Sequence, residues 1–145
     1  MEIRDLLTHK GKETYTIGAD RAVVDAVDEL NSKHIGALMV YGDEGQIVGI
    51  LSERDILRNL KALDSRKTVR EIMTPRDQMI IGHEDDSIEY AMSVFTKNKI
   101  RHLPIIEGEK LVGLVSIGDV VRASLDNAEF ENKNLRDYIT GSFAG

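Results

Sequence analysis

Apolar residues recur at helical spacing in two segments, one in each half of the chain. Spacings of three and four residues place them on one face of a helix: Val23, Val24, Ala26, Val27 and Leu30 in the first half, and Ile88, Ala91, Met92 and Phe95 in the second. We expect the first helix to begin after Asp20. Asp85, Asp86 and Ser87 are candidate caps for the second, and Asp86 and Glu89 have the spacing of a capping box.

Short apolar runs predict strands on both sides of each helix. Extended stretches at 15–17 and 79–81 precede the helices. Two runs with turn residues between them follow, and predict β-hairpins at 36–41 with 46–51 and at 102–106 with 110–115. Each half should end in a helix that buries three apolar residues: Ile56, Leu57 and Leu60, or Val120, Val121 and Leu125. The predicted fold class is therefore α/β (α+β-like), with two β-α-β-β-α repeats packed in pseudo-twofold symmetry.

One segment of the chain is present twice. Gly49-Ile50-Leu51-Ser52-Glu53-Arg54-Asp55 returns 64 residues later as Gly113-Leu114-Val115-Ser116-Ile117-Gly118-Asp119. A period of this length is longer than that of solenoid repeats, so it indicates a duplicated small domain. A unit of about 65 residues would bury only roughly 60% of its unfolded surface alone, so the two halves should pack on each other.

The repeats divide the chain into four parts. We assign residues 1–62 to the first repeat with an N-terminal lead-in, 63–68 to a linker and 69–126 to the second repeat. Residues 127–145 form a C-terminal tail that we expect to pack on the module.

A shorter pattern is present three times, at a period of 66 residues. It reads Ile3-Arg4-Asp5-Leu6-Leu7-Thr8, then Val69-Arg70-Glu71-Ile72-Met73-Thr74, then Leu135-Arg136-Asp137-Tyr138-Ile139-Thr140. Short amphipathic helices resemble one another by chance, which is one explanation. The other is that the third copy packs at an edge equivalent to those used by the first two.

The composition is that of a soluble globular protein. Hydrophobic residues make up 41% and charged residues 30%, and no apolar run is long enough to span a membrane. The N-terminal residues do not form a signal peptide, so we expect a cytoplasmic protein. The net charge of −6 argues against nucleic-acid binding. Because the chain has no cysteine, disulfides and thiol chemistry are excluded.

The Ser-x-x-Asp motifs, Ser52 to Asp55 and Ser116 to Asp119, have two interpretations. Their spacing is that of a capping box with aspartate in place of Glu or Gln, so both can be helix caps alone. Alternatively, the carboxylate accepts hydrogen bonds from the two hydroxyls of a ribose, and the free N–H groups at the helix start bind a phosphate. Gly49 and Gly113 need no ligand, since close strand packing also selects glycine.

These motifs resemble those of a known family. The tandem β-α-β-β-α units, each ending in Gly-apolar-apolar-Ser-x-x-Asp, are similar to a cystathionine-β-synthase (CBS) domain pair, or Bateman module. The resemblance covers residues 3–125, and includes 69–75, 100–105 and 113–121. It implies a stand-alone regulatory module that binds adenosine-containing ligands between its repeats and commonly pairs into disc-shaped dimers. It further implies that Asp55 and Asp119 bind ribose, with Ser52 and Ser116 close to ribose or phosphate.

Local positive charge is expected at Arg101 and His102, where the family often places phosphate-contacting groups. An exposed arginine that pairs with a surface carboxylate is the alternative. The first repeat has Gly36 and Ala37 at the equivalent positions, so the two sites should be unequal. Arg54 either reaches a phosphate or is solvated on its helix.

The adenine should lie among apolar residues and backbone near Ile17, Ala37, Ile81 and Leu103, although these side chains also fit an ordinary core. No histidine has the spacing of a metal ligand, so no metal site is expected; magnesium would arrive only with a bound polyphosphate. The chain has no nucleophile elbow, Walker loop or dinucleotide fingerprint, and we expect no catalysis.

Two functions follow from these observations. The first is a regulatory module that binds AMP, ADP, ATP or NAD and, as a homodimer, modulates a partner protein whose identity the sequence does not give. The second is a ligand-independent dimerisation or interaction domain, in which both Ser-x-x-Asp motifs only cap helices.

The third copy of the short pattern gives a first prediction. Deleting residues 134–145 should lower the melting temperature or weaken dimerisation, because a packed edge would be lost. Thermal melting and light scattering measure both, and unchanged values would contradict the packing of this copy.

Overall fold

The first half of the chain forms a four-stranded sheet with helices on it. The computed structural model describes residues 1–11, 13–64 and 66–140, and only the backbone of 129–131 and 134–140. Strand order in the sheet is β1-β2-β3-β4, in which β1 and β2 are parallel and the other pairs antiparallel. Its elements are β1 (Thr16–Gly18), α2 (Val23–Lys33), β2 (Ala37–Tyr41), β3 (Ile47–Ser52), α3 (Glu53–Arg58), the 3-10 turn η1 (Leu60–Ala62) and β4 (Thr74–Pro75).

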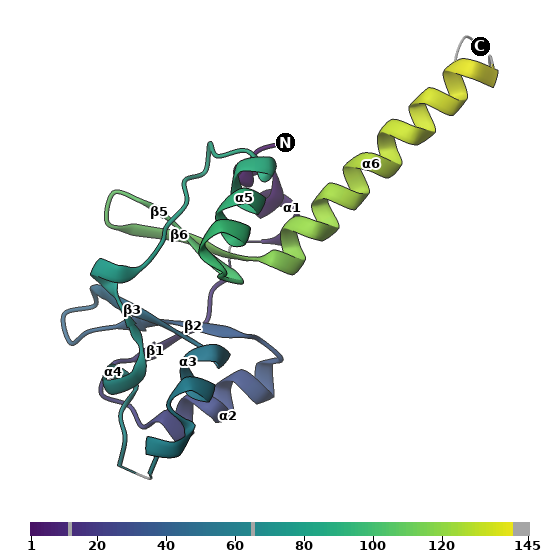
Figure 1. The fold of residues 1–145 in the computed structure, drawn as a ribbon. Coiled ribbons are helices and arrows are strands. Elements are labelled where there is room, and N and C mark those ends of the chain that lie inside the picture. The colour runs from purple at the N-terminus through teal and green to yellow at the C-terminus, as the bar shows by residue number, and fades with distance from the viewer. Residues whose placement is uncertain (12, 65, 141–145) are drawn as a thin grey trace.

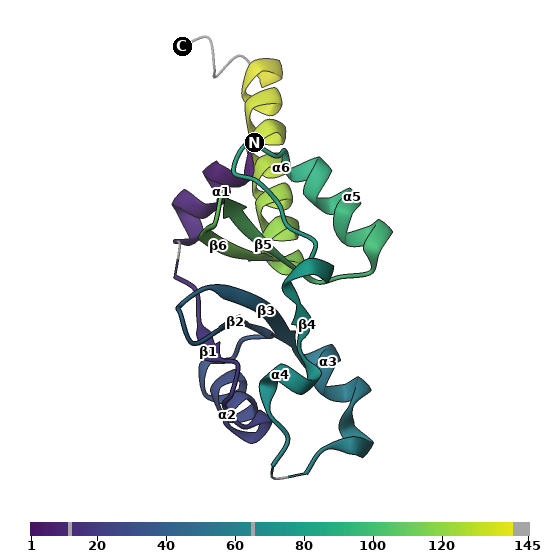
Figure 2. The same ribbon diagram turned by 90° about the vertical axis from the view of Figure 1, so that its left-hand side faces the viewer.

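The second half repeats this order around a hairpin. After the 3-10 turn η2 (Arg76–Gln78) come α5 (Ile88–Asn98), β5 (His102–Glu107), β6 (Lys110–Ser116) and α6 (Ile117–Thr140). Residues 79–81 do not form the predicted strand. At the place that corresponds to β1 in the first half, the second half has only a single parallel bridge, from Gly82 to Ile105. The α/β class and the duplicated arrangement are confirmed, and Figures 1 and 2 show the two halves one above the other.

Two short helices are exchanged between the halves. Helix α1 (Ile3–Lys10) precedes the first repeat in sequence, but its apolar residues Ile3, Leu6 and Leu7 belong to the core of the second half. Helix α4 (Val69–Ile72) follows the first repeat, and Val69 and Ile72 complete the core of that repeat. Each hydrophobic core therefore includes a helix that lies in front of the other repeat in sequence.

Matching backbone hydrogen bonds hold both exchanged helices. Ile3 N donates to Asp86 O and Ile88 N to Met1 O, at 2.9 and 3.1 Å. The first half has the same pair in Val69 N to Arg21 O and Val23 N to Lys67 O, both 2.9 Å. Each exchanged helix thus pairs with the segment before the main helix of its host half, and the pseudo-twofold relation extends to individual hydrogen bonds.

The motif glycines make room for these exchanged segments. A Cβ at Gly49 would lie 2.5 Å from Thr74 O and 2.8 Å from Met73 Sδ, and a Cβ at Gly113 would lie 2.9 Å from Leu7 Cδ2. Side chains larger than glycine would push α4–β4 and α1 away from the sheets. Close packing therefore explains both glycines without a ligand.

Several residues predicted to be buried are exposed instead. Ile56 is half-buried and Val120 fully buried, as expected. Exposed apolar side chains on the outer helix faces are Val24, Leu57, Leu60, Val121 and Leu125. The helices lie on the surface of each half, so only one narrow face of each contacts a core.

The cap of α5 also differs from the prediction. Its N-cap is Ser87, whose Oγ accepts a hydrogen bond from Tyr90 N at 3.0 Å. Asp86 accepts from His83 N instead, so Asp86 and Glu89 do not form the expected capping box. Among the three cap candidates, serine has this role.

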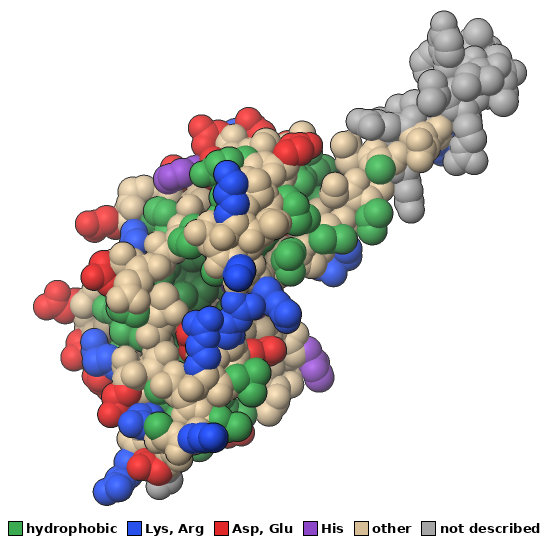
Figure 3. Space-filling view, in the orientation of Figure 1, with side chains coloured by type: hydrophobic (Ala, Val, Ile, Leu, Met, Phe, Trp, Pro, Cys, Tyr) green, Lys and Arg blue, Asp and Glu red, His purple; other side chains and the backbone are tan. Residues whose placement is uncertain are grey.

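Helix α6 continues far beyond the second core. Figure 1 shows its C-terminal half extending away from the rest of the chain, and Figure 3 shows hydrophobic side chains on its described surface. The third copy of the short pattern, at 135–140, lies in this helix, and its side chains fall outside the described residues. Residues 127, 128, 132 and 133 are exposed, and the packing of the tail on the module stays a prediction.

The exchange predicts that α1 contributes to global stability. Leu7 is 1% exposed in the second core, so Leu7→Ala should lower the free energy of unfolding by about 2–5 kcal/mol. Leu57→Ala is the control, because Leu57 is 69% exposed and its removal should change stability little. Urea unfolding measures both values. Similar losses in the two variants would contradict a role of α1 in the core.

Candidate functional site

Two clefts lie between the halves, and each contains one Ser-x-x-Asp motif. The first cleft has a volume of about 440 Å³, and the second about 370 Å³. Residues that line the first cleft include Ser52, Arg54, Asp55, Arg58, Thr74, Met79, Ile80, Lys99, Arg101 and His102. Residues that line the second include Lys10, Tyr15, Gly36, Ala37, His102, Ser116, Asp119 and Arg122.

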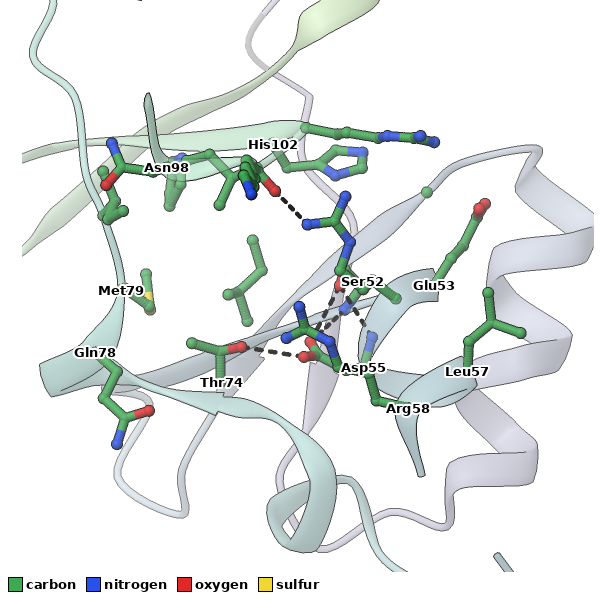
Figure 4. A pocket seen from close by; sticks show the side chains of 18 residues that line it. Ser52, Glu53, Asp55, Leu57, Arg58, Thr74, Gln78, Met79, Asn98 and His102 are labelled. Atoms are coloured by element: carbon green, nitrogen blue, oxygen red, sulfur yellow. Dashed lines mark hydrogen bonds between the residues drawn. The ribbon is translucent and has the colours of Figure 1, made fainter. Parts of the chain in front are cut away.

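Asp55 is the buried acid of the first cleft. Its Oδ2 accepts hydrogen bonds from the backbone N and the Oγ of Ser52, at 2.9 and 3.1 Å, and its Oδ1 accepts from Thr74 Oγ1 at 3.2 Å. Thr74 lies on β4, so the first repeat and the exchanged segment jointly orient the carboxylate, as Figure 4 shows. All three donors are neutral groups, and the side chain is in no ion pair within the described part of the chain.

Both motifs cap their helices. Asp55 N donates to Ser52 Oγ at 3.3 Å and Asp119 N to Ser116 Oγ at 3.1 Å. The first N–H group of each helix is also used, since Glu53 N donates to Gly36 O and Ile117 N to Arg101 O. These bonds use backbone N–H groups at the helix starts that the sequence suggested as phosphate donors. Phosphate binding is therefore left to nearby side chains.

Four cationic side chains line the first cleft. Arg54 donates from Nη1 to the carbonyl of Lys99 and so links α3 to the end of α5 across the cleft. The side chains of Arg58, Lys99 and Arg101 have no hydrogen bond or ion pair to any described residue. Figure 3 shows Lys and Arg side chains gathered between the two halves on this face. The cleft therefore combines a carboxylate, that of Asp55, whose hydrogen-bond donors are all neutral, with cationic side chains that form no ion pair to a described acid.

His102 forms a wall that both clefts share. Its ring lies against Gly36, where an added Cβ would be 2.8 Å from Nε2. The small residue at position 36 thus makes room for the imidazole rather than for an open face of the backbone. Burial lowers the pKa of His102 below the ordinary histidine value, and the positive charges of Lys10 and Arg101 lower it further, against an opposing effect of Asp119.

The second cleft has a different acid environment. Asp119 Oδ2 accepts hydrogen bonds from Lys10 Nζ at 2.6 Å and from Ser116 N at 2.8 Å, and Oδ1 accepts from Arg122 Nη2 at 2.8 Å. Burial opposes ionisation of Asp119, but the bonds from Lys10 and Ser116 together outweigh it and hold the pKa below its ordinary value. In contrast to Asp55, this carboxylate is paired with two cations.

The predicted base contacts fall in different places. Ala37 lines the second cleft, whereas Ile17 belongs to the first core and Leu103 to the second. Ile81 is half-buried and lines neither cleft. Other residues of the same extended stretches line the clefts instead: Tyr15 the second, and Met79 and Ile80 the first.

Sequence reasoning missed several cleft residues. Arg58 and Arg122 each follow the motif aspartate by three residues, so the repeated pattern Ser-x-x-Asp-x-x-Arg could have identified them. Thr74 stands in the repeated 69–74 segment but gave no sign of its contact with Asp55. Lys10 had no sequence signal, because its partner Asp119 is far away in the chain.

Some kinds of site find no support in the described residues. No cluster of three or more His, Asp or Glu side chains that could hold a metal ion occurs among them. None of the described helices combines the length and the apolar character needed to cross a membrane.

Comparison with known proteins identifies the same two repeats. The family model described as CBS domain matches residues 3–62 and 69–126. The chain is 35% identical, over 97% of its length, to the mitochondrial CBS domain-containing protein CBSX3 of Arabidopsis thaliana, and covers 73% of that protein. A CBS-domain containing protein of Agrobacterium tumefaciens has a similar crystal structure, with a TM-score of 0.80 and 30% identity over 85% of this chain and 92% of that one.

Two similar structures contain adenosine compounds. CBSX2 in complex with AMP has a TM-score of 0.71 and 26% identity, and the alignment covers 88% of this chain and 98% of that one. The CBS domain pair of MJ0100, in complex with 5′-methylthioadenosine and S-adenosyl-L-methionine, has a TM-score of 0.75 and the same identity and coverage.

The lowered pKa of His102 predicts sensitivity to acid. The unfolded chain takes up a proton at this residue near its ordinary pKa of about 6.5, whereas the folded protein resists protonation. The stability contributed by neutral His102 is therefore present above that pH and is lost as the pH falls toward the folded pKa. Urea unfolding at neutral pH and at about pH 5 should show a smaller acid-induced loss in His102→Gln than in the wild type.

His9→Gln is the matched control, because exposed His9 lines neither cleft. It should keep the acid-induced loss of the wild type. Equal losses in the His102 variant and the wild type would contradict the assignment.

Proposed function

Because the chain belongs to the CBS-domain family, we propose that it is a regulatory module that binds an adenosine nucleotide in the first cleft and modulates a partner protein without chemistry. The environment of Asp55 carries this proposal. A buried carboxylate with only neutral donors faces a cleft whose cations have no acidic partner. This combination suits a ligand with a neutral diol and an anionic group.

The placement of the ligand follows from these charges. The ribose hydroxyls would donate to the Asp55 carboxylate, near Ser52 and Thr74. The phosphate would lie among Arg58, Lys99 and Arg101, where guanidinium groups can donate two parallel hydrogen bonds. Met79 and Ile80 offer an apolar surface for the base.

The ligand class is an adenosine nucleotide: AMP, ADP, ATP or NAD. A volume of about 440 Å³ lies in the range of small-molecule sites. The AMP complex of a similar structure supports this class. Magnesium would accompany a polyphosphate, because the described residues offer no cluster that would hold the ion alone.

Regulation would act through the contact between the halves. Arg54 already links α3 to α5 across the first cleft, so a bound phosphate would compete for this arginine or add to the link. A ligand shifts a conformation only as far as it binds one state more tightly. Binding between the halves meets this condition, since any change in their separation alters contacts with the ligand.

We further propose that the module works as a homodimer. Exposed apolar side chains on the outer helices give a surface for a second copy: Val24, Leu57, Leu60, Tyr90, Val121 and Leu125. The cytoplasmic location remains a prediction, and the relative CBSX3 is mitochondrial by name.

A ligand-independent interaction domain is the second candidate. The observation in its favour is that both motifs do cap their helices, with reciprocal bonds between Ser52 and Asp55 and between Ser116 and Asp119. Under this function, loss of either aspartate would lower stability and leave every affinity unchanged.

Calorimetry with AMP, ADP, ATP and NAD on Asp55→Ala distinguishes the two. Loss of a charged acceptor should weaken nucleotide binding at the first cleft by roughly tenfold or more. Loss of the cap should lower stability by about 1 kcal/mol. Asp5→Ala is the matched control, because Asp5 accepts from Glu2 N at 2.9 Å in an equivalent cap outside both clefts.

The control should lose the stability of its cap and keep nucleotide affinity. If wild-type protein gives neither heat nor a thermal shift with any of the four nucleotides, the regulatory proposal is wrong and the interaction domain remains.

A further inference from the structure

Lys10 occupies the place at the second cleft where a sugar would bind by analogy with the first. Its Nζ donates to Asp119 Oδ2 and to the backbone carbonyl of Leu114, both at 2.6 Å. The lysine side chain is 32% exposed and the aspartate 10%, so the pair lies partly out of water. The ammonium is thus held by the motif strand and by the motif aspartate together.

The equivalent carboxylate in the first cleft has no such partner. Asp55 accepts hydrogen bonds from Ser52 and Thr74, which are neutral and leave no charge behind when a ligand rearranges them. At Asp119, an incoming diol must take an oxygen from Lys10 and leave a partly buried ammonium without its counterion. This loss has to be offset by the ligand itself.

We propose that Lys10 determines the specificity of the second cleft, so that this cleft accepts nucleoside phosphates and rejects neutral nucleosides. A phosphate gives the displaced ammonium a new anionic partner, which a nucleoside does not. The inference rests on the proposed function, since it assigns a ligand preference to the second of the two clefts.

Other groups near Asp119 do not replace Lys10 in this role. Arg122 contacts the other oxygen, Oδ1, and its side chain is 71% exposed, so water can solvate it when a ligand arrives. His102 is held below its ordinary pKa and adds little positive charge at neutral pH. The lowered pKa of Asp119 agrees with an ionised pair at neutral pH.

The location of Lys10 connects this preference to the fold. It is the last residue of α1, the exchanged helix, and is followed by Gly11 at a φ of 91°. Lys10, which lines the second cleft, thus belongs to helix α1, the segment that precedes the first repeat and packs in the core of the second half. A ligand that moves Lys10 acts directly on the end of this helix.

Calorimetry with AMP and adenosine tests the proposal in an Asp55→Ala background, where binding at the first cleft is weakened and the effect of changing Lys10 reports on the second cleft. AMP should bind at least about tenfold more tightly than adenosine. Adding Lys10→Ala should raise adenosine affinity by about tenfold without a gain for AMP, so that the two affinities become similar. Lys10→Arg keeps the positive charge and should retain the preference for AMP.

Lys97→Ala is the matched control, because exposed Lys97 lies on α5 and lines neither cleft. It should leave the ratio of AMP to adenosine affinity unchanged. If Lys10→Ala also leaves this ratio unchanged, or creates no adenosine binding, the inference is wrong even where wild-type protein binds nucleotide at the first cleft. Absence of any nucleotide binding to wild-type protein would instead overturn the proposed function together with this inference.

Discussion

The exchange of α1 and α4 is the contact on which the rest of the structure depends. Neither half has a complete core of its own, because Ile3, Leu6 and Leu7 pack in the second half and Val69 and Ile72 in the first. Halves of this size would bury only about 60% of their unfolded surface separately, which makes their stability marginal. The exchange supplies the missing surface and holds the halves together, so the clefts between them exist because the cores are shared.

The same arrangement makes two similar motifs into two different sites. Each cleft takes its aspartate from one repeat and part of its opposite wall from the other: Asp55 faces Arg101, and Asp119 faces Ala37. Gly36 and His102 line both clefts, so a change at either of these two positions alters both sites. Lys10 and Thr74 increase the difference, because one places a cation and the other a hydroxyl on the motif carboxylate.

Local features of this fold could be predicted from the sequence, and non-local ones could not. The hairpins and the caps at Ser52 and Ser116 depend on residues close in sequence, and their patterns were sufficient. The burial of Leu57 and Val121 was predicted wrongly, because periodicity gives a helix face but not how much of it meets a core. The Lys10–Asp119 pair joins residues 109 positions apart, and no local pattern marks either as a partner of the other.

The exchanged helix α1 has a consequence for how the chain folds. Its backbone partners Glu84 and Asp86 are about 80 positions away, so its hydrogen bonds close a long loop. During synthesis α1 leaves the ribosome well before the strands that it will cover, and its apolar face has no native partner until then. Contacts of such long range slow folding and expose apolar surface on the way. The two repeats follow each other in the sequence, but each core is complete only when the exchanged helix has packed on it.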